Sequence, residues 1–128
     1  MKNKLSVLFA GLLCLVYISP AQADSIIQLW TCSLNDGKTR TELMEVSAVW
    51  MKAAKTMTGG EEFEAYIEYP LAADDVDAFT FVLVAKSAAT WGAFQDAYVG
   101  SAAEKADEAW NNVADCSDSS LWSSVKIE

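Results

Sequence analysis

The residues of this chain that could do chemistry are aromatic side chains lying close to polar ones. An aromatic wall with a few convergent polar groups is the usual form of a pocket for a small apolar or aromatic ligand. Asn35 and Arg40 follow the first apolar segment and could stand at the mouth of such a pocket. The alternative is that the aromatic residues simply belong to the core. The candidate residues are Trp30, Asn35, Arg40, Trp50, Tyr66 and Trp91.

The absence of histidine excludes several kinds of site. Histidine is the usual general base and the usual nitrogen ligand of haem, zinc and copper. The serines of segment 117–120 therefore cannot form a Ser-His-Asp triad. Glu64 and Glu68 would lie about 13 Å apart on one strand face, too far to share a proton. Segment 74–77 lacks the spacing of an EF-hand loop. We predict neither a metal site nor a cofactor.

The cysteines predict one disulfide bond. Cys32 and Cys116 are 84 positions apart and do not form a CxxC motif. The third cysteine, Cys14, lies in the N-terminal apolar run that export is expected to remove. In an oxidising compartment, the remaining even pair favours a disulfide over a metal site or a redox dithiol. In the chain-entropy model, closing so long a loop stabilises the fold by about 4 kcal/mol.

The N-terminus has the pattern of a secretory signal peptide. Lys2 and Lys4 precede an apolar run from 5 to 18, and Ala21 and Ala23 form a small-x-small cleavage site. The run is too short for a good membrane anchor, and no second apolar run follows it. We therefore expect cleavage between Ala23 and Asp24 and a periplasmic or secreted domain covering 24–128, with no membrane span.

The charge of the chain limits its partners. The net charge is −9, and removal of Lys2 and Lys4 would change it to −11. Such a surface repels nucleic acid phosphates and anionic lipid, so we expect no nucleic acid partner. The acidity is compatible with cationic or neutral partners, and it could also serve only to keep an exported protein soluble.

The first half of the exported segment predicts a strand followed by a helix. Residues 25–34 are apolar and favour a strand. Residues 39–57 carry apolar side chains at helical spacing, and Thr39 and Glu42 have the spacing of a capping box. Residues 62–71 then alternate between apolar and polar types, which predicts a half-buried strand.

The second half predicts another strand, a divided helical region and a last strand. Residues 78–85 form an apolar run typical of a central strand. Thr90 could cap a short helix, and Gly100 would separate it from a second helical piece that begins after Ser101. Residues 120–127 alternate again, which predicts a strand packed through Val125 and Ile127.

This order of elements predicts an α+β, ferredoxin-like βαββαβ fold with a four-stranded antiparallel sheet. The first and last strands are neighbours in that fold, which brings the regions of Cys32 and Cys116 together. The helices cover only one sheet face, and apolar residues remain on the other. Because an exposed apolar face marks an interface, we expect a homodimer. The expected interface residues are Tyr66, Val82, Val84 and Trp122.

The segments FEAYIEYPLA and AFTFVLVAKSAATWGAFQDAY resemble the dimeric α+β-barrel superfamily. That group includes antibiotic-biosynthesis-type monooxygenases, stress-responsive barrel proteins and NIPSNAP-like proteins. The resemblance implies a dimer of two sheets, with a cavity between each sheet and its helices. Some members oxidise aromatic substrates without a cofactor. Others degrade haem through a histidine ligand, which this chain lacks.

Two functions remain open at this point. The first is a non-catalytic exported module that binds a small or hydrophobic ligand or a protein partner. The second is a cofactor-independent monooxygenase acting on an aromatic substrate, which Trp, Tyr, Asn and Arg side chains would position. The lack of histidine and of an acid/base pair favours the first.

Overall fold

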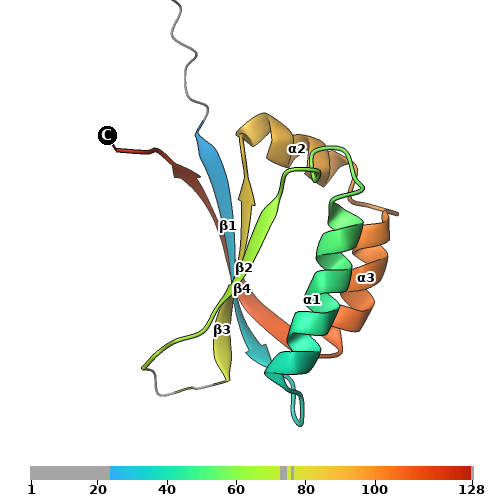
Figure 1. Ribbon diagram of the computed structural model, residues 1–128, viewed down its shortest axis with the longest axis vertical. Helices are drawn as coiled ribbons and strands as arrows, with labels where there is room; N and C mark the ends of the chain where they lie inside the picture. The colour runs from blue at the N-terminus through green and yellow to red at the C-terminus, as the bar shows by residue number, and fades with distance from the viewer. Residues whose placement is uncertain (1–23, 73–74, 76, 128) are drawn as a thin grey trace, which may run out of the picture.

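The computed structural model describes residues 24–72, 75 and 77–127. The expected signal peptide, residues 1–23, lies outside the described residues, as does Asp74 of the acidic turn. The described chain forms one four-stranded sheet and three helices (Figure 1). In chain order, the elements are β1 (Ser25–Leu34), α1 (Arg40–Ala54), β2 (Glu64–Glu68), β3 (Ala78–Ala85), α2 (Ala88–Asp96), α3 (Ala102–Asn111) and β4 (Ala114–Ser124).

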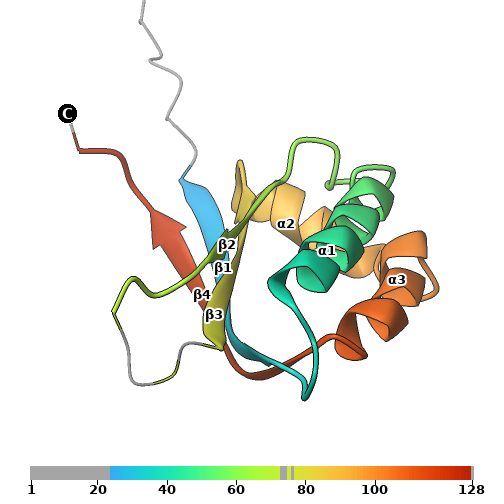
Figure 2. The ribbon, with the colours of Figure 1, turned by 60° about the horizontal axis from the view of Figure 1, so that its bottom comes forward.

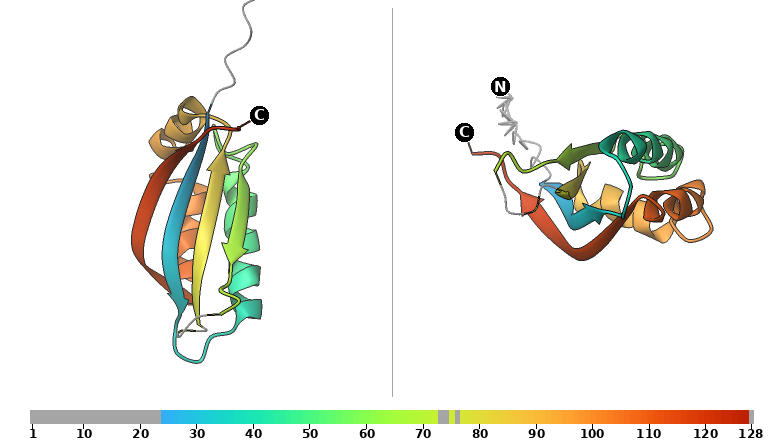
Figure 3. Two further views of the ribbon diagram at one scale, coloured as in Figure 1. Left: turned by 90° about the vertical axis from the view of Figure 1, so that its left-hand side faces the viewer. Right: turned by 90° about the horizontal axis from the view of Figure 1, so that it is seen from below.

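The sheet has the strand order β2-β3-β1-β4, and each neighbouring pair is antiparallel. All three helices lie on one face of the sheet, and the other face is left uncovered (Figures 1 and 3). The predicted ferredoxin-like α+β fold is therefore confirmed. Two predicted strands, 25–34 and 78–85, have the bounds that the sequence indicated.

The main core lies between the sheet and the helices, because one side of each strand points there. Along β3, Phe79, Phe81 and Leu83 are all buried and belong to the core cluster. The helices contribute Leu43 and Phe94, which are almost completely inaccessible to solvent. The view turned by 60° shows the helices packed as one layer over the sheet (Figure 2).

The helix starts follow from local side-chain chemistry. Thr39 and Glu42 form the predicted capping box of α1, with hydrogen bonds in both directions. Ser101 caps α3 through Oγ, which accepts a hydrogen bond from the backbone N–H of Glu104. Gly100 has a φ of 79°, a left-handed conformation that separates α2 from α3 as expected.

The start of α2 differs from the prediction. The N-cap is Ser87, whose Oγ accepts from the backbone N–H of Thr90, so Thr90 lies within the helix. Ser87 has the extended backbone of a cap and is separated by one residue from the end of β3 at Ala85. The cap therefore lies three residues earlier than the sequence pattern suggested.

The last strand also differs from its prediction. β4 begins at Ala114 and ends at Ser124, so it includes Cys116 and most of a polar run. Pairing with β1 holds this run in a strand, with a register irregularity between Thr31 and Cys32. Val125 and Ile127 lie beyond the strand and are 67% and 95% exposed, so neither packs against the helices.

No helix in the described part of the chain is long and apolar enough to cross a membrane. Within the same residues, no group of three His, Cys, Asp or Glu side chains is placed to hold a metal ion.

Candidate ligand cavity between the sheet and the helices

A cavity of about 310 Å³ lies between the helix-covered face of the sheet and the helices. Strands β1, β3 and β4 and all three helices contribute to its wall. Its lining is largely aromatic, with polar side chains among the rings. The lining residues are Gln28, Trp30, Trp50, Phe81, Leu83, Phe94, Gln95, Tyr98, Asp107, Trp110, Asn111 and Cys116.

The aromatic part of the wall is organised around Phe81. Its ring centroid lies 5.5 Å from Trp30, 5.8 Å from Trp50 and 5.8 Å from Trp110. The ring planes meet at 45°, 89° and 64°, so no pair is stacked in parallel. Edge-to-face and tilted contacts of this kind are favourable. The rings thus come from β1, β3, α1 and α3 and form several sides of one cavity.

A chain of hydrogen bonds crosses the polar side of the cavity. The Trp50 indole N–H donates to the Tyr98 hydroxyl at 3.4 Å, and that hydroxyl donates to Asp107 Oδ2. Burial raises the pKa of Asp107, and the hydrogen bonds from Tyr98 and Trp50 oppose that rise. Burial, followed by the bond to Asp107, raises the pKa of Tyr98 well above its ordinary value.

Trp91 lies behind the cavity wall. Its indole N–H donates to Gln28 Oε1 at 3.0 Å. Gln28 lines the cavity, but Trp91 does not. The reason is the position of α2 over the sheet, which brings Phe94 and Gln95 to the cavity instead. Trp91 therefore orients a polar side chain of the wall.

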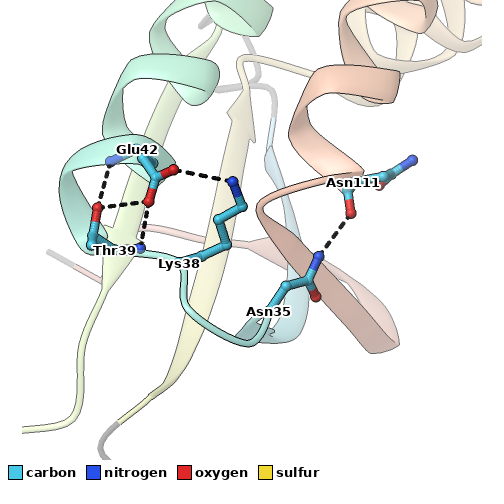
Figure 4. A network of polar contacts seen from close by, with 5 residues as sticks. All are labelled: Asn35, Lys38, Thr39, Glu42 and Asn111. Atoms are coloured by element: carbon cyan, nitrogen blue, oxygen red, sulfur yellow. Dashed lines mark hydrogen bonds and ion pairs between the residues drawn. The ribbon is translucent and has the colours of Figure 1, made fainter.

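Asn35 also lies outside the cavity wall, but it is hydrogen-bonded to a residue of that wall. Its Nδ2 donates to the backbone carbonyl of Asn111 at 3.0 Å (Figure 4). The backbone N–H of Asn35 donates to the carbonyl of Val113 at 2.9 Å. Asn111 lines the cavity, so Asn35 fixes the end of α3 where that helix meets the cavity.

Arg40 and Tyr66 are placed away from the cavity. The Arg40 guanidinium lies 4.1 Å from the centroid of the Tyr69 ring, a cation–π contact. Tyr66 is 50% exposed on the uncovered sheet face and donates to Glu64 Oε2 at 2.6 Å. Because side chains alternate along a strand, Tyr66 and the helix-facing Ile67 lie on opposite faces. Of the six candidates, the structure brings Trp30 and Trp50 together at the cavity.

The predicted disulfide between Cys32 and Cys116 is confirmed, and it belongs to this region. The two cysteines are paired in register between β1 and β4. Cys32 is almost completely buried, and Cys116 lines the cavity. The bond therefore closes the β4 side of the cavity wall covalently.

Sequence reasoning missed the residues that α3 contributes. The sequence pattern places Trp110 only in the helical piece after Ser101, and it does not distinguish Asp107 from the other carboxylates. The two are three positions apart on one helix, so they share a face. A carboxylate on the same helix face as a tryptophan was the available signal. Phe81 and Tyr98 were likewise assigned only to their strand and helix.

The fold has counterparts among solved structures, although no protein-family model and no curated protein sequence matches the chain. SnoaB, a cofactor-independent oxygenase from Streptomyces nogalater, superimposes with a TM-score of 0.59 at 12% identity. That alignment covers 82% of this chain and 97% of SnoaB. A Chloroflexus aurantiacus protein named for antibiotic biosynthesis monooxygenases gives 0.54 at 10% identity, covering 81% and 96%.

A conserved protein from Methanosarcina mazei gives a TM-score of 0.58 at 8% identity, with coverage of 81% and 96%. This chain shares their fold. The resemblance noted from its sequence is thereby confirmed at the level of the ferredoxin-like α+β architecture. At these identities a likeness shows the fold, and the activity must be argued from the cavity.

Proposed function

We propose that this protein binds a small molecule with an apolar or aromatic body in the cavity between its sheet and its helices. The observation that carries the proposal is the cavity wall, in which Trp30, Trp50, Phe81 and Trp110 surround a shared space. Its volume, about 310 Å³, lies at the lower end of the range for small-molecule sites. The polar side chains of the wall would orient the ligand.

Two experiments test the proposal: the identification of a bound molecule and a titration with a defined probe. Native mass spectrometry of the gently purified protein should detect a bound small molecule. Isothermal titration calorimetry with 2-naphthol supplies a defined aromatic probe. Trp30→Ala should weaken binding of that probe by about tenfold or more, whereas Trp122→Ala, at an exposed position outside the cavity, should leave it unchanged. Equal affinities in both variants would contradict the site.

The protein is further proposed to work in the periplasm or outside the cell. The N-terminal pattern and the Cys32–Cys116 bond support this, because disulfides persist in oxidising compartments. The intact mass of the processed protein should correspond to a chain that begins at Asp24. A mature soluble form that retains Met1 would overturn the proposal.

A homodimer through the uncovered sheet face is proposed as the assembly. The register places Ile27, Val84 and Trp122 in one row and Leu29 and Val82 in the next. An apolar patch of this kind favours an interface between copies. Light scattering at micromolar concentration should give the mass of a dimer, and Trp122→Glu should give a folded monomer. A wild-type monomer would contradict this assembly.

A second candidate function is oxidation of an aromatic substrate by O₂ without a cofactor. The fold shared with SnoaB and the Asp107 carboxylate beside the aromatic wall support it. Hydroquinone and O₂ would give hydroxybenzoquinone and water. The substrate then supplies all the electrons, one oxygen atom enters the ring, and the other leaves as water. Asp107 would accept a phenolic proton in this reaction.

Oxygen uptake separates the two candidates. Hydroquinone with wild-type protein should consume O₂ faster than hydroquinone alone if the protein is an oxygenase. Asp107→Asn should then lose the excess rate. If the protein binds 2-naphthol but does not accelerate the consumption of O₂ by hydroquinone, the binding function stands. Oxidation of hydroquinone is then excluded.

A further inference from the structure

We infer that the cavity takes an organic cation, such as a quaternary ammonium compound, with its apolar groups against the aromatic walls and its charge near Asp107. This inference rests on the proposed binding function and adds the charge of the ligand to it. Three features of the described residues support it: the aromatic composition of the wall, the sign of its charge and the remaining capacity of its carboxylate.

The wall has the composition of an aromatic cage. Three tryptophans, two phenylalanines and one tyrosine line a single cavity of about 310 Å³. Rings of this kind attract a cation through the negative potential of their faces, and tryptophan gives the strongest attraction. The rings also meet at steep angles around Phe81, so different walls can contact different sides of a compact ligand.

The charge of the wall has one sign. Asp107 is its charged member, and none of the described residues lining the cavity is Lys or Arg. An anionic ligand would therefore place its charge beside a half-buried carboxylate without a basic partner, which is unfavourable. A cationic ligand would instead be attracted to this carboxylate. The net charge of −9 acts in the same direction by raising the local concentration of cations.

Asp107 keeps acceptor capacity for such a ligand. Tyr98 donates to Oδ2, and the indole of Trp50 donates to the Tyr98 hydroxyl. These bonds fix the carboxylate within the wall and lower the pKa of Asp107, which favours its charged form against the effect of burial. A carboxylate offers two oxygen atoms with several lone pairs, so one phenolic donor does not exhaust it. A quaternary ammonium needs no hydrogen bond and requires only a negative charge nearby.

The experiment compares two probes of nearly the same shape. Choline and 3,3-dimethyl-1-butanol differ mainly in the exchange of a charged nitrogen for a carbon atom. Titration calorimetry of the wild-type protein should give an affinity for choline at least about tenfold higher than for the alcohol. Added NaCl should weaken choline binding and leave the alcohol unaffected, because salt screens the charge.

Two variants locate the charge. Asp107→Asn should reduce choline affinity by about tenfold or more without changing that for the alcohol. Glu108→Gln is the matched control, because it removes an exposed carboxylate from the neighbouring position of α3, outside the cavity wall. It should leave both affinities unchanged. If Asp107→Asn fails to fold, Tyr98→Phe is the second variant: it keeps the carboxyl group but removes a hydrogen bond that lowers the pKa of Asp107, so the preference for choline should weaken as the pH falls.

The outcomes separate this inference from the proposed function. Equal binding of choline and the alcohol would overturn the inference, as would equal losses in Asp107→Asn and Glu108→Gln. If neither probe binds while 2-naphthol does, the inference fails and the binding function stands. If choline, the alcohol and 2-naphthol all fail to bind, both fail.

Discussion

Two kinds of polar pair, tryptophan–serine and tyrosine–carboxylate, occur both in the helix layer and on the uncovered face of the sheet. On the helix-covered side, the Trp110 indole donates to Ser47 Oγ at 2.9 Å, and both residues are buried. On the uncovered face, the Trp122 indole donates to Ser120 Oγ at 2.8 Å, and both residues are exposed. The hydrogen bonds are nearly the same length, so burial is the difference between them.

The tyrosine–carboxylate pairs repeat this contrast. Tyr98 donates to Asp107 beside the cavity, and Tyr66 donates to Glu64 on the uncovered face. Burial is the largest cause of the raised pKa of Tyr98, whereas the hydrogen bond to Glu64 is the largest cause for Tyr66. Both pairs thus raise the pKa of their tyrosine, but the largest cause of the rise differs with burial.

The largest expected contrast concerns two aromatic residues near β2. Phe63 is fully buried, with its ring centroid 4.6 Å from that of Phe94, whereas Tyr66 is 50% exposed. Phe63→Ala should lower the free energy of unfolding by about 3–5 kcal/mol because it leaves a cavity. Tyr66→Ala should cost about 1 kcal/mol or less in the monomer. Urea denaturation measures both, and equal losses would contradict the division between the faces.

Loss of the disulfide should have the next largest effect. Replacing both Cys32 and Cys116 by Ser should lower the free energy of unfolding by about 2–5 kcal/mol, because the unfolded chain is no longer cross-linked. Chemical denaturation of the double variant, compared with oxidised wild-type protein, measures this. An unchanged denaturation midpoint would show that β1–β4 pairing alone closes this side of the cavity.

The tryptophan–serine pairs give a matched test of intermediate size. Ser47→Ala should cost about 1–3 kcal/mol, because the buried Trp110 N–H then lacks its partner. Ser120→Ala should be nearly neutral in the monomer, because water can replace the hydroxyl at the exposed Trp122. The two losses of unfolding free energy can also be compared at high and low protein concentration. If Ser120→Ala costs as much as Ser47→Ala only at concentrations at which the protein is a dimer, the uncovered face is buried in the assembly.

The tyrosines give the smallest effect, visible only in alkali. The raised pKa of Tyr98 means that its neutral form is favoured in the folded state. Its contribution to stability is therefore complete below the unfolded pKa of about 10 and is lost as the pH rises towards the folded value. Between about pH 8 and pH 11, Tyr98→Phe should lose less stability than wild-type protein, as measured by urea midpoints. Tyr66→Phe should differ less from wild type, and a larger effect there would contradict the assigned burial.

Much of the architecture was predictable because it depends on neighbours along the chain. The strands at 25–34 and 78–85 are mostly apolar segments, and their bounds were confirmed. The caps at Thr39 and Ser101 are formed by side chains that bond to the backbone three residues later. The polar segment of β4 could not be recognised in this way, because its pairing with β1 stabilises it more than its own composition does.

The sequence by itself determined the ferredoxin-like element order, the disulfide pair and the aromatic content from which a cavity could be built. The tertiary structure decided which aromatic residues share the cavity. Trp91 and Trp110 both lie on helices, but only Trp110 reaches the wall. That choice depends on how each helix is rotated and placed over the sheet, which is fixed by packing between residues far apart in sequence. For the same reason, the raised pKa of Asp107 exists only in the folded protein, because burial is its largest cause.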